Sequence, residues 1–309
     1  MPLSPDVQIE HAALIVDTFA AFGFLEKPLG LVPLAGTGDA WQVQTALRKL
    51  FVKRIPPNER TALDVYDWAR QALLAKKLRQ ARLFRLRDGS AVTPTGCAVY
   101  EFLPGRPVED LSDVQFDRQV RYLGRYLRAL QDVPTDVYVG SDSLWSKPFE
   151  LDFLEYELPL LLSAADITDP VREVAEDARK AIVTRRVDIA ALPVQLIHSD
   201  IGPGNILFRG DTVTAIVDFT PELANHVYPF CVSLFWHCIN HGVNIDRIQR
   251  GRRLYMGRRV VTPAERELFP TFLLYATAYR LFVRILAGYS PDRLAHIAGR
   301  TREVMAVQW

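Results

Sequence analysis

The sequence has few cysteines, no long apolar run and almost no net charge, and each shortage excludes a class of protein. Three cysteines in 309 residues, with no Cys-x-x-Cys pair, exclude a disulfide framework and argue against a zinc ribbon or a thioredoxin-type centre. The longest apolar stretches, near residues 229–239 and 269–279, reach only about half of the roughly 20 residues that span a bilayer. No basic segment followed by an apolar run opens the sequence. We therefore expect a cytoplasmic protein with no membrane partner.

The charge balance also limits the choice of partners. Lys and Arg total 37 and Asp and Glu total 36, which gives a formal net charge of +1. Nucleic-acid binders usually carry an excess of basic residues, so we expect no nucleic-acid partner. The sequence contains no GxxxxGK[ST] motif, which excludes a P-loop nucleotidase, and its one GTG turn is not followed by a helix, which counts against a Rossmann site.

The spacing of apolar residues changes along the chain and divides it in two. Helical spacing predicts helices at residues 9–22, 61–77, 114–130, 151–162, 171–183, 230–240, 263–287 and 291–307. Alternating or short apolar runs predict strands at residues 31–34, 41–45, 50–55, 81–86 and 96–102 and a β island at 194–218. Thr61 is the expected N-cap of its helix, with Asp64 in a capping box. We predict an α+β fold with a small β-rich N-terminal lobe (1–104) and a larger, mainly helical C-terminal lobe (105–309).

The β island carries the chemistry. It has the spacing His-x-Asp-x4-Asn and then, after a hairpin turn, Asp-Phe, formed by His198, Asp200, Asn205 and Asp218. The hairpin brings Asn205 and Asp218 together, where their oxygens suit a hard cation such as Mg²⁺. Asp200 lies in the preceding loop and can accept a proton from an attacking hydroxyl. With a lysine for the phosphates, these are the parts needed for phosphoryl transfer. The alternative is that Asp200 only caps a turn and that Asn205 and Asp218 are ordinary hairpin residues.

This pattern resembles the catalytic and metal loops of the aminoglycoside phosphotransferase and choline kinase superfamily, which has a protein-kinase-like fold. Within it, the chain is most similar to the homoserine kinases of that fold, and the likeness extends to residues 98–105 and 255–265. The resemblance implies ATP and Mg²⁺ as cofactors. It also implies that Asp200 is the catalytic base, that His198 supports its loop, and that Asn205 and Asp218 hold the metal.

The same resemblance assigns the nucleotide site to the N-terminal lobe. Lys53 stands where the family places its phosphate-binding lysine, and a lysine inside an apolar strand is costly unless it is paired. An exposed position on an edge strand is the alternative. The turn with Gly36 and Gly38 would cover the phosphates. The backbone near Glu101 and Leu103 would hold the adenine.

Two positions depart from the family pattern. The helix after Lys53 contains no Glu to hold that lysine, and we expect Asp67 to take this role. Pro229 stands where relatives carry an Asp that braces the catalytic loop, so the bracing must come from elsewhere.

The composition after Asp218 indicates the acceptor. Residues 219–309 contain twelve arginines, no lysine and six acids, which favours an anionic acceptor over a polycationic one. Arg280 lies on an apolar helix and can bind the carboxylate of a hydroxy amino acid. The alternative is that it pairs with a protein acid such as Asp246 or Glu222.

Trp236 and His237 belong to an aromatic helix and either line the acceptor pocket or pack in the core. His237, Cys238 and His241 could also suggest zinc, but no third ligand and base are evident. We predict an ATP- and Mg²⁺-dependent kinase whose partner is a small molecule with a hydroxyl group, for example homoserine. The alternatives are an aminoglycoside- or choline-type kinase and a non-catalytic nucleotide-binding protein on the same fold.

Overall fold

The computed structural model describes residues 5–34, 39–138, 140, 144–257 and 261–309. The turn with Gly36 and Gly38, which we expected to cover the phosphates, lies outside the described residues.

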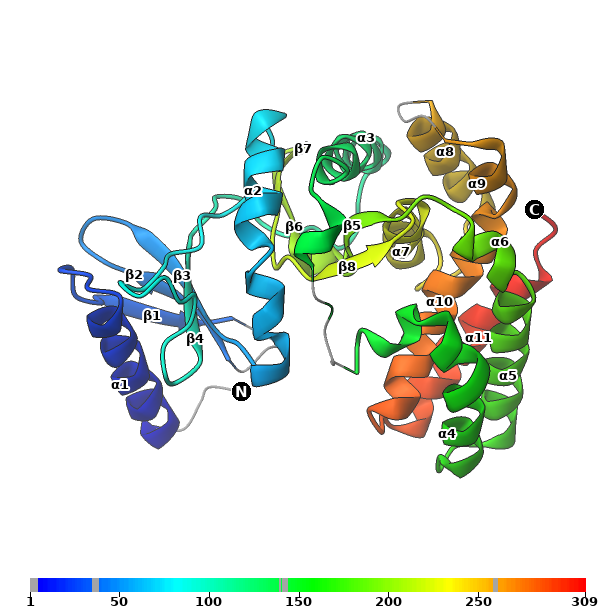
Figure 1. The fold of residues 1–309 in the computed structure, drawn as a ribbon, viewed down its shortest axis with the longest axis horizontal. Coiled ribbons are helices and arrows are strands. Elements are labelled where there is room, and N and C mark those ends of the chain that lie inside the picture. The colour runs from blue at the N-terminus through cyan, green and yellow to red at the C-terminus, as the bar shows by residue number, and fades with distance from the viewer. Residues whose placement is uncertain (1–4, 35–38, 139, 141–143, 258–260) are drawn as a thin grey trace.

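The N-terminal part is built on a four-stranded antiparallel sheet with the order β1-β2-β3-β4. Its elements are α1 (Pro5–Ala21), β1 (Gly30–Pro33), β2 (Ala40–Gln44), β3 (Lys49–Arg54), η1 (Pro57–Leu63), α2 (Tyr66–Ala75) and β4 (Cys97–Glu101). Helix α1 covers one face of the sheet (Figure 1), where Ile15 and Phe19 pack with Trp41 and Val52. The opposite face contributes Ala98 and Tyr100 to the core that continues into the helical part.

The helix expected at residues 61–77 is two helices. The first, η1, is a 3₁₀ helix that begins after Pro56, so Thr61 lies inside it and caps nothing. Its hydroxyl instead donates a hydrogen bond to the Gly140 carbonyl at 3.2 Å, and Asp64 ends η1 rather than completing a capping box. The predicted inner stripe is confirmed, because Leu63, Tyr66, Ala69 and Leu73 are all buried.

The strand expected at residues 81–86 is only partly formed. This segment runs beside β4 with one isolated bridge, between Leu83 and Tyr100. Two further backbone hydrogen bonds flank it, from Phe84 to Val99 and from Glu101 to Arg82. These contacts hold the segment beside the sheet without extending the four-stranded ladder.

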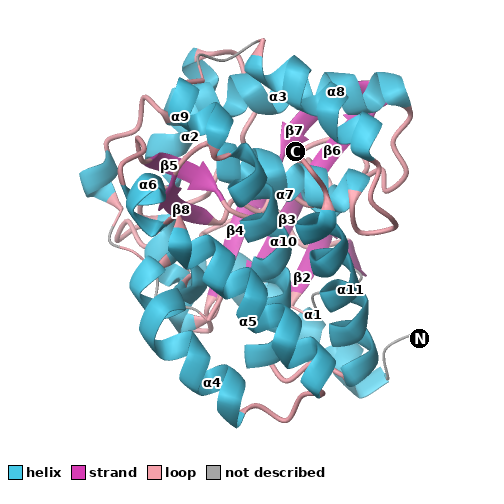
Figure 2. Cartoon of the chain, turned by 90° about the vertical axis from the view of Figure 1, so that its right-hand side faces the viewer, coloured by secondary structure: helices cyan, strands magenta, loops and turns pink. Residues whose placement is uncertain are grey.

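The rest of the chain is mainly helical (Figure 2), with two small antiparallel sheets that pair β5 with β8 and β6 with β7. The helices are α3 (Asp113–Leu130), η2 (Thr135–Val137), η3 (Lys147–Phe149), η4 (Phe153–Glu157), α4 (Leu158–Ala164), α5 (Asp169–Thr184), α6 (Arg186–Ala190), η5 (Pro203–Asn205), α7 (Val227–Cys238), α8 (Ile245–Met256), α9 (Pro263–Glu267), α10 (Phe269–Leu286) and α11 (Pro291–Ala306). The strands are β5 (Gln195–His198), β6 (Ile206–Arg209), β7 (Thr212–Ile216) and β8 (Pro221–Ala224). Helix α10 packs against α5, α7 and α11. Across the described ranges, no helix combines the length and apolar character that crossing a bilayer requires.

A glycine allows close packing where the N-terminal part connects to the helical part. Gly105 has a φ of +146°, and a Cβ there would lie 2.8 Å from both Leu207 and Thr214, so only glycine lets the chain pass. The next residue, Arg106, exchanges backbone hydrogen bonds of 2.9 and 2.8 Å with Phe208. The connection after β4 is therefore attached directly to the β6–β7 hairpin, whose ends carry Asn205 and Asp218.

Candidate active site

His198 ties together the two loops that carry the polar residues of the β island. It ends β5 and is fully buried. Its Nδ1 accepts hydrogen bonds from the backbone N–H groups of Asp200 and Thr220, both at 3.3 Å, and its Nε2 donates to the Val217 carbonyl at 3.1 Å. Burial lowers the pKa of His198, so the ring is neutral and can accept at one nitrogen while it donates at the other.

Asp200 is held at both carboxylate oxygens. Arg280 Nη2 donates to Oδ1 at 2.8 Å, and the Asn205 amide donates to Oδ2 at 3.0 Å and to the Asp200 carbonyl at 2.9 Å. Burial alone would raise the pKa of Asp200, but the charge of Arg280 and these hydrogen bonds outweigh it and the pKa is lowered. The side chain is 43% exposed. Asp200 is thus an ionised, oriented carboxylate that a hydroxyl compound can reach.

Arg280 does not pair with Asp246 or Glu222, as the alternative interpretation held; its acidic partner is Asp200. The residue is only 8% exposed and comes from the middle of α10. Its guanidinium lies 5.2 Å from the ring centre of Trp236 and 5.5 Å from that of Tyr279. The pKa of Arg280 is raised because the charge of Asp200 outweighs the opposing effect of burial.

Trp236 and His237 are neighbours on α7 but point to different places. A Cβ at Gly202 would lie 3.3 Å from the indole Nε1 of Trp236, so Trp236 packs directly against the Asp200 loop. His237 instead lies near Arg247 and the Glu109 backbone, and burial, followed by the Arg247 charge, lowers its pKa to about 4. Of these two predicted residues, only Trp236 is among the contacts of the Asp200 loop.

Asp218 and Lys53 connect the hairpin to the sheet. The Lys53 Nζ lies 2.5 Å from Asp218 Oδ1, and their side chains are 22% and 39% exposed. Asp218 has a φ of +54°, in the left-handed region that non-glycine residues rarely adopt and that costs about 1–2 kcal/mol. Its neighbours hold this conformation, because Val217 donates its N–H to the Asn205 carbonyl at 2.8 Å. Backbone strain of this kind clusters at functional sites.

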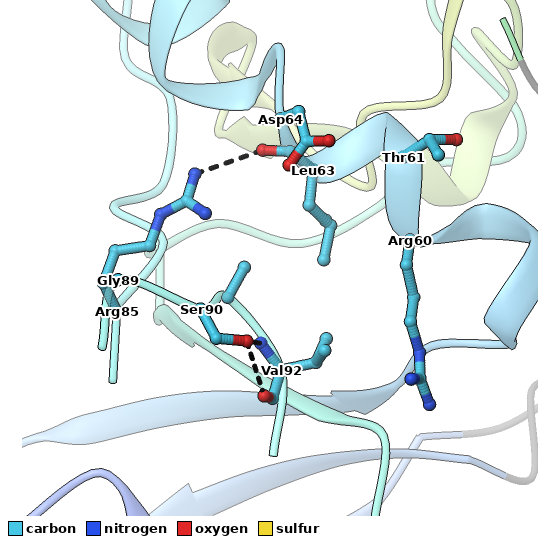
Figure 3. A pocket seen from close by; sticks show the side chains of 9 residues that line it. Arg60, Thr61, Leu63, Asp64, Arg85, Gly89, Ser90 and Val92 are labelled. Atoms are coloured by element: carbon cyan, nitrogen blue, oxygen red, sulfur yellow. Dashed lines mark hydrogen bonds between the residues drawn. The ribbon is translucent and has the colours of Figure 1, made fainter. Parts of the chain in front are cut away.

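The expected pair between Lys53 and Asp67 is wrong for this structure. Asp67 Oδ2 accepts hydrogen bonds from Arg85 at 2.8 and 3.2 Å, and Arg85 also donates to the Leu63 carbonyl at 3.2 Å. Figure 3 shows Arg85 extending toward the η1 backbone at the edge of a hollow of about 270 Å³. Asp67 pairs with Arg85 instead, because the irregular segment at residues 81–86 places Arg85 beside α2.

The expected adenine-binding stretch follows directly from β4. Glu101 is the last residue of that strand, and its carboxylate accepts a hydrogen bond from the Arg82 N–H at 3.3 Å and lies 3.8 Å from Arg79. Leu103 is buried. The role of these two residues in binding adenine stays a prediction.

Asn205 and Asp218 fit a hard metal ion by their donor types. The Asn205 amide directs its N–H groups to Asp200, which leaves its oxygen as the atom available for other ligands. Asp218 shares one carboxylate oxygen with Lys53 and contributes a second. An amide oxygen and a carboxylate at the two ends of one hairpin are the ligand types that Mg²⁺ prefers.

Pro229 is accommodated without the Asp that the family resemblance led us to expect here. It lies in the first turn of α7, where a missing N–H leaves no helical hydrogen bond unmade. The turn is anchored instead by Asn225, which accepts from the Val227 N–H at 3.0 Å and donates to Glu265 at 2.7 Å. The Asp200 loop takes its support from His198 and Asn205.

Sequence reasoning missed one buried carboxylate as a titrating group. Glu222 on β8 is 7% exposed and accepts hydrogen bonds from the hydroxyls of Tyr138, at 3.1 Å, and Ser146. Burial raises its pKa to about 7, against the lowering effect of these two bonds. No pattern in the sequence indicates this, because both hydroxyls come from about 80 residues earlier in the chain.

Known proteins share this architecture. Residues 31–222 match the model of the phosphotransferase enzyme family. A homoserine kinase from Azorhizobium caulinodans is 27% identical over 253 residues, which cover 77% of this chain and 72% of the relative.

Two solved structures share the fold across nearly the whole chain. An aminopropanol kinase associated with a microcompartment has a TM-score of 0.70 at 15% identity and covers 94% of each chain. An amicoumacin kinase, in complex with AMP-PNP, Ca²⁺ and Ami, has a TM-score of 0.67 at 17% identity and covers 98% of this chain and 96% of its own. The family match spans more than half of the sequence and includes Lys53, His198, Asp200, Asn205 and Asp218. The chain is a small-molecule kinase of protein-kinase-like fold and belongs to the phosphotransferase enzyme family.

Proposed function

We propose that this kinase transfers the γ-phosphoryl group of ATP, with Mg²⁺, to the hydroxyl of a hydroxy amino acid such as homoserine. The observation that supports this most directly is the grouping of an oriented carboxylate, Asp200, with Asn205, Asp218 and Lys53. Each of these residues has the chemistry of one part of a phosphoryl-transfer site.

Asp200 would accept the proton of the acceptor hydroxyl as its oxygen bonds to the γ-phosphorus. The bond from that phosphorus to the bridging oxygen breaks, and ADP leaves with the electron pair. The lowered pKa of Asp200 keeps it ionised at neutral pH and suits a role that is largely orientation.

Lys53 would exchange its partner when nucleotide binds. It holds Asp218 through an exposed ion pair, so the same Nζ can move to the phosphates while Asp218 turns to the metal. Asn205 and Asp218 would hold Mg²⁺, which would neutralise charge on the β- and γ-phosphates.

Two observations favour an amino-acid acceptor over the aminoglycoside- and choline-type alternatives. The acceptor side of the chain carries an excess of arginine, which suits an anion. In addition, a sequence relative that covers 77% of the chain at 27% identity is a homoserine kinase. A non-catalytic role is disfavoured because Lys53, Asp200, Asn205 and Asp218 are all present and grouped.

A turnover screen tests this proposal. ADP formation with ATP and Mg²⁺ is measured against homoserine, other hydroxy amino acids, choline and kanamycin, for wild type and Asp200→Asn. We expect homoserine-class acceptors to be turned over and Asp200→Asn to lower kcat about 10²–10⁴-fold. Asp211→Asn, an exposed aspartate in the β6–β7 turn, is the matched control and should behave as wild type. Unchanged single-turnover transfer in Asp200→Asn would refute the assignment of the base.

A further inference from the structure

Arg280 is buried with fewer partners than its chemistry requires. A guanidinium carries five N–H donors, and a buried one normally has most of them bonded. Here one bond goes to Asp200, and the buried Nε has no acceptor among the described residues. Asp200, the residue's carboxylate partner, is itself needed for the acceptor. A second anion beside Arg280 would satisfy donors that the protein leaves open.

Trp236 adds a second unbonded donor at the same place. Its indole Nε1 is buried, has no hydrogen-bond acceptor in the described part of the chain, and faces the backbone at Gly202. The Arg280 guanidinium also lies over this ring, 5.2 Å from its centre, as in a cation–π contact. Two oriented N–H-bearing groups therefore flank the Asp200 loop.

The local charge is positive once Asp200 is engaged elsewhere. Arg284, one turn further along α10, lies close enough for its pKa to be lowered by burial and by the charge of Arg280. No acidic partner of Arg284 is found among the described residues, and its guanidinium stacks on Tyr289 at 5.7 Å. A carboxylate arriving from solution would meet two arginines and one aspartate.

We infer that Arg280 exchanges partners during the reaction: it binds Asp200 in the free enzyme and the carboxylate of the acceptor in the ternary complex. This inference rests on the proposed function and adds to it the residue that selects the acceptor. Because Arg280 Nη2 and Asp200 Oδ1 are 2.8 Å apart, an acceptor bound to both must carry its hydroxyl and its carboxylate a few bonds apart. Short hydroxy acids meet this condition, and larger cationic acceptors do not.

In this exchange the acceptor's carboxylate replaces Asp200 as the partner of Arg280, and this makes Asp200 available for the acceptor's hydroxyl. An acceptor carboxylate that draws Arg280 away frees Oδ1 of Asp200 to accept the hydroxyl, while Asn205 keeps Oδ2 oriented. An acceptor that lacks a carboxylate leaves the Arg280–Asp200 pair in place and must compete with it. Selectivity for an acceptor with a carboxylate then has two sources: the Arg280–Asp200 pair disfavours other acceptors, and the new contact with Arg280 favours this one.

Matched acceptors test the exchange. Homoserine and homoserine amide share the hydroxyl and the amine and differ only in the carboxylate. We expect wild type to prefer homoserine by about 100-fold in kcat/KM, a difference typical of a desolvated charged contact. Arg280→Gln should bring this ratio close to 1, chiefly through KM for homoserine. Arg280→Lys should retain part of it, and added guanidinium should restore turnover of homoserine, but not of the amide, in a folded Arg280→Ala.

Arg300→Ala is the control, because it removes an arginine that pairs with Glu303 on α11 and has no contact with Asp200; its ratio should stay as in wild type. Calorimetry of both compounds in the presence of AMP-PNP and Mg²⁺ gives a readout that does not need turnover. Equal wild-type affinity and kcat/KM for homoserine and its amide would overturn the exchange while leaving the kinase function intact. Binding of homoserine without any transfer would support the exchange and refute the proposed function, and no binding would overturn both.

Discussion

The acceptor side and the nucleotide side of the site are built differently. On the acceptor side, His198 is fully buried and the Arg280 side chain is 10% exposed, and both are bonded to the Asp200 loop. On the nucleotide side, the side chains of Lys53 and Asp218 are 22% and 39% exposed and form a single ion pair. The difference indicates that the protein fixes the Asp200 loop in advance and leaves Lys53 and Asp218, which we propose to bind the phosphates and metal, free to change partners.

On the proposed nucleotide side, the largest effect is expected from Asp218. Asp218→Asn should lower the rate of phosphoryl transfer by about 10²–10³-fold, because it removes a charged ligand from the phosphate site. Stability should change little, since Asn tolerates the left-handed conformation at least as well as Asp. Asp218→Ala should lose the same activity and in addition about 1 kcal/mol of stability. Single-turnover assays and thermal unfolding measure the two effects, and equal stability of the two variants would contradict the strain.

Substitutions on the two sides should differ most clearly in how much they lower the free energy of unfolding. His198→Ala removes the partners of three half-buried backbone groups and should cost about 3 kcal/mol. Lys53→Met breaks an exposed pair and should change stability by about 0.5 kcal/mol or less, while it raises the KM for ATP. Chemical denaturation and ATP kinetics on both variants test this contrast. A Lys53→Met protein as unstable as His198→Ala would show that the nucleotide side is as rigid as the acceptor side.

The most gradual effect, spread over the pH range between about 4.5 and 7, is expected from Glu222 on β8, the strand paired with β5. Its folded-state pKa of about 7 exceeds the ordinary 4.5, so the folded protein keeps a proton that the unfolded chain releases. Stability is therefore fully present below about pH 4.5 and falls by about 3 kcal/mol as the pH rises to 7.

Glu222→Gln should remove this slope. The measurement is the melting temperature between pH 4.5 and 8, compared with wild type and with Glu303→Gln, an exposed acid that pairs with Arg300. A slope that persists in Glu222→Gln would assign the titration to another group.

The sequence predicts which residues form the site better than it predicts which residues they contact. The grouping of Asp200, Asn205 and Asp218 could be predicted because a hairpin brings its ends together within about 20 residues. The partners of Asp67 and Arg280 could not, since Arg85 and Asp200 reach them through packing of segments that no local pattern places.

The fold shows the same difference between features that a local sequence pattern predicts and features that it does not. Long amphipathic helices such as α3 and α5 lie where the apolar spacing predicts them. Helix α8 was not predicted, because its polar sequence carries many arginines and a narrow apolar stripe. The expected cap at Thr61 is wrong because Pro57 starts a 3₁₀ helix four residues earlier, and the turn chemistry of that segment outweighs the Thr signal.

Arg280 lies outside residues 31–222, the stretch that matches the family, whereas Lys53, Asp200, Asn205 and Asp218 lie within it. With the roles proposed above, acceptor choice and phosphoryl transfer would be encoded in separate parts of the sequence. Substitutions in α7 and α10 can accumulate during evolution without altering the transfer residues, which allows one scaffold to diversify among metabolites. For protein engineers, the inward face of α10 around Arg280 is accordingly the first place to randomise when a new acceptor is wanted.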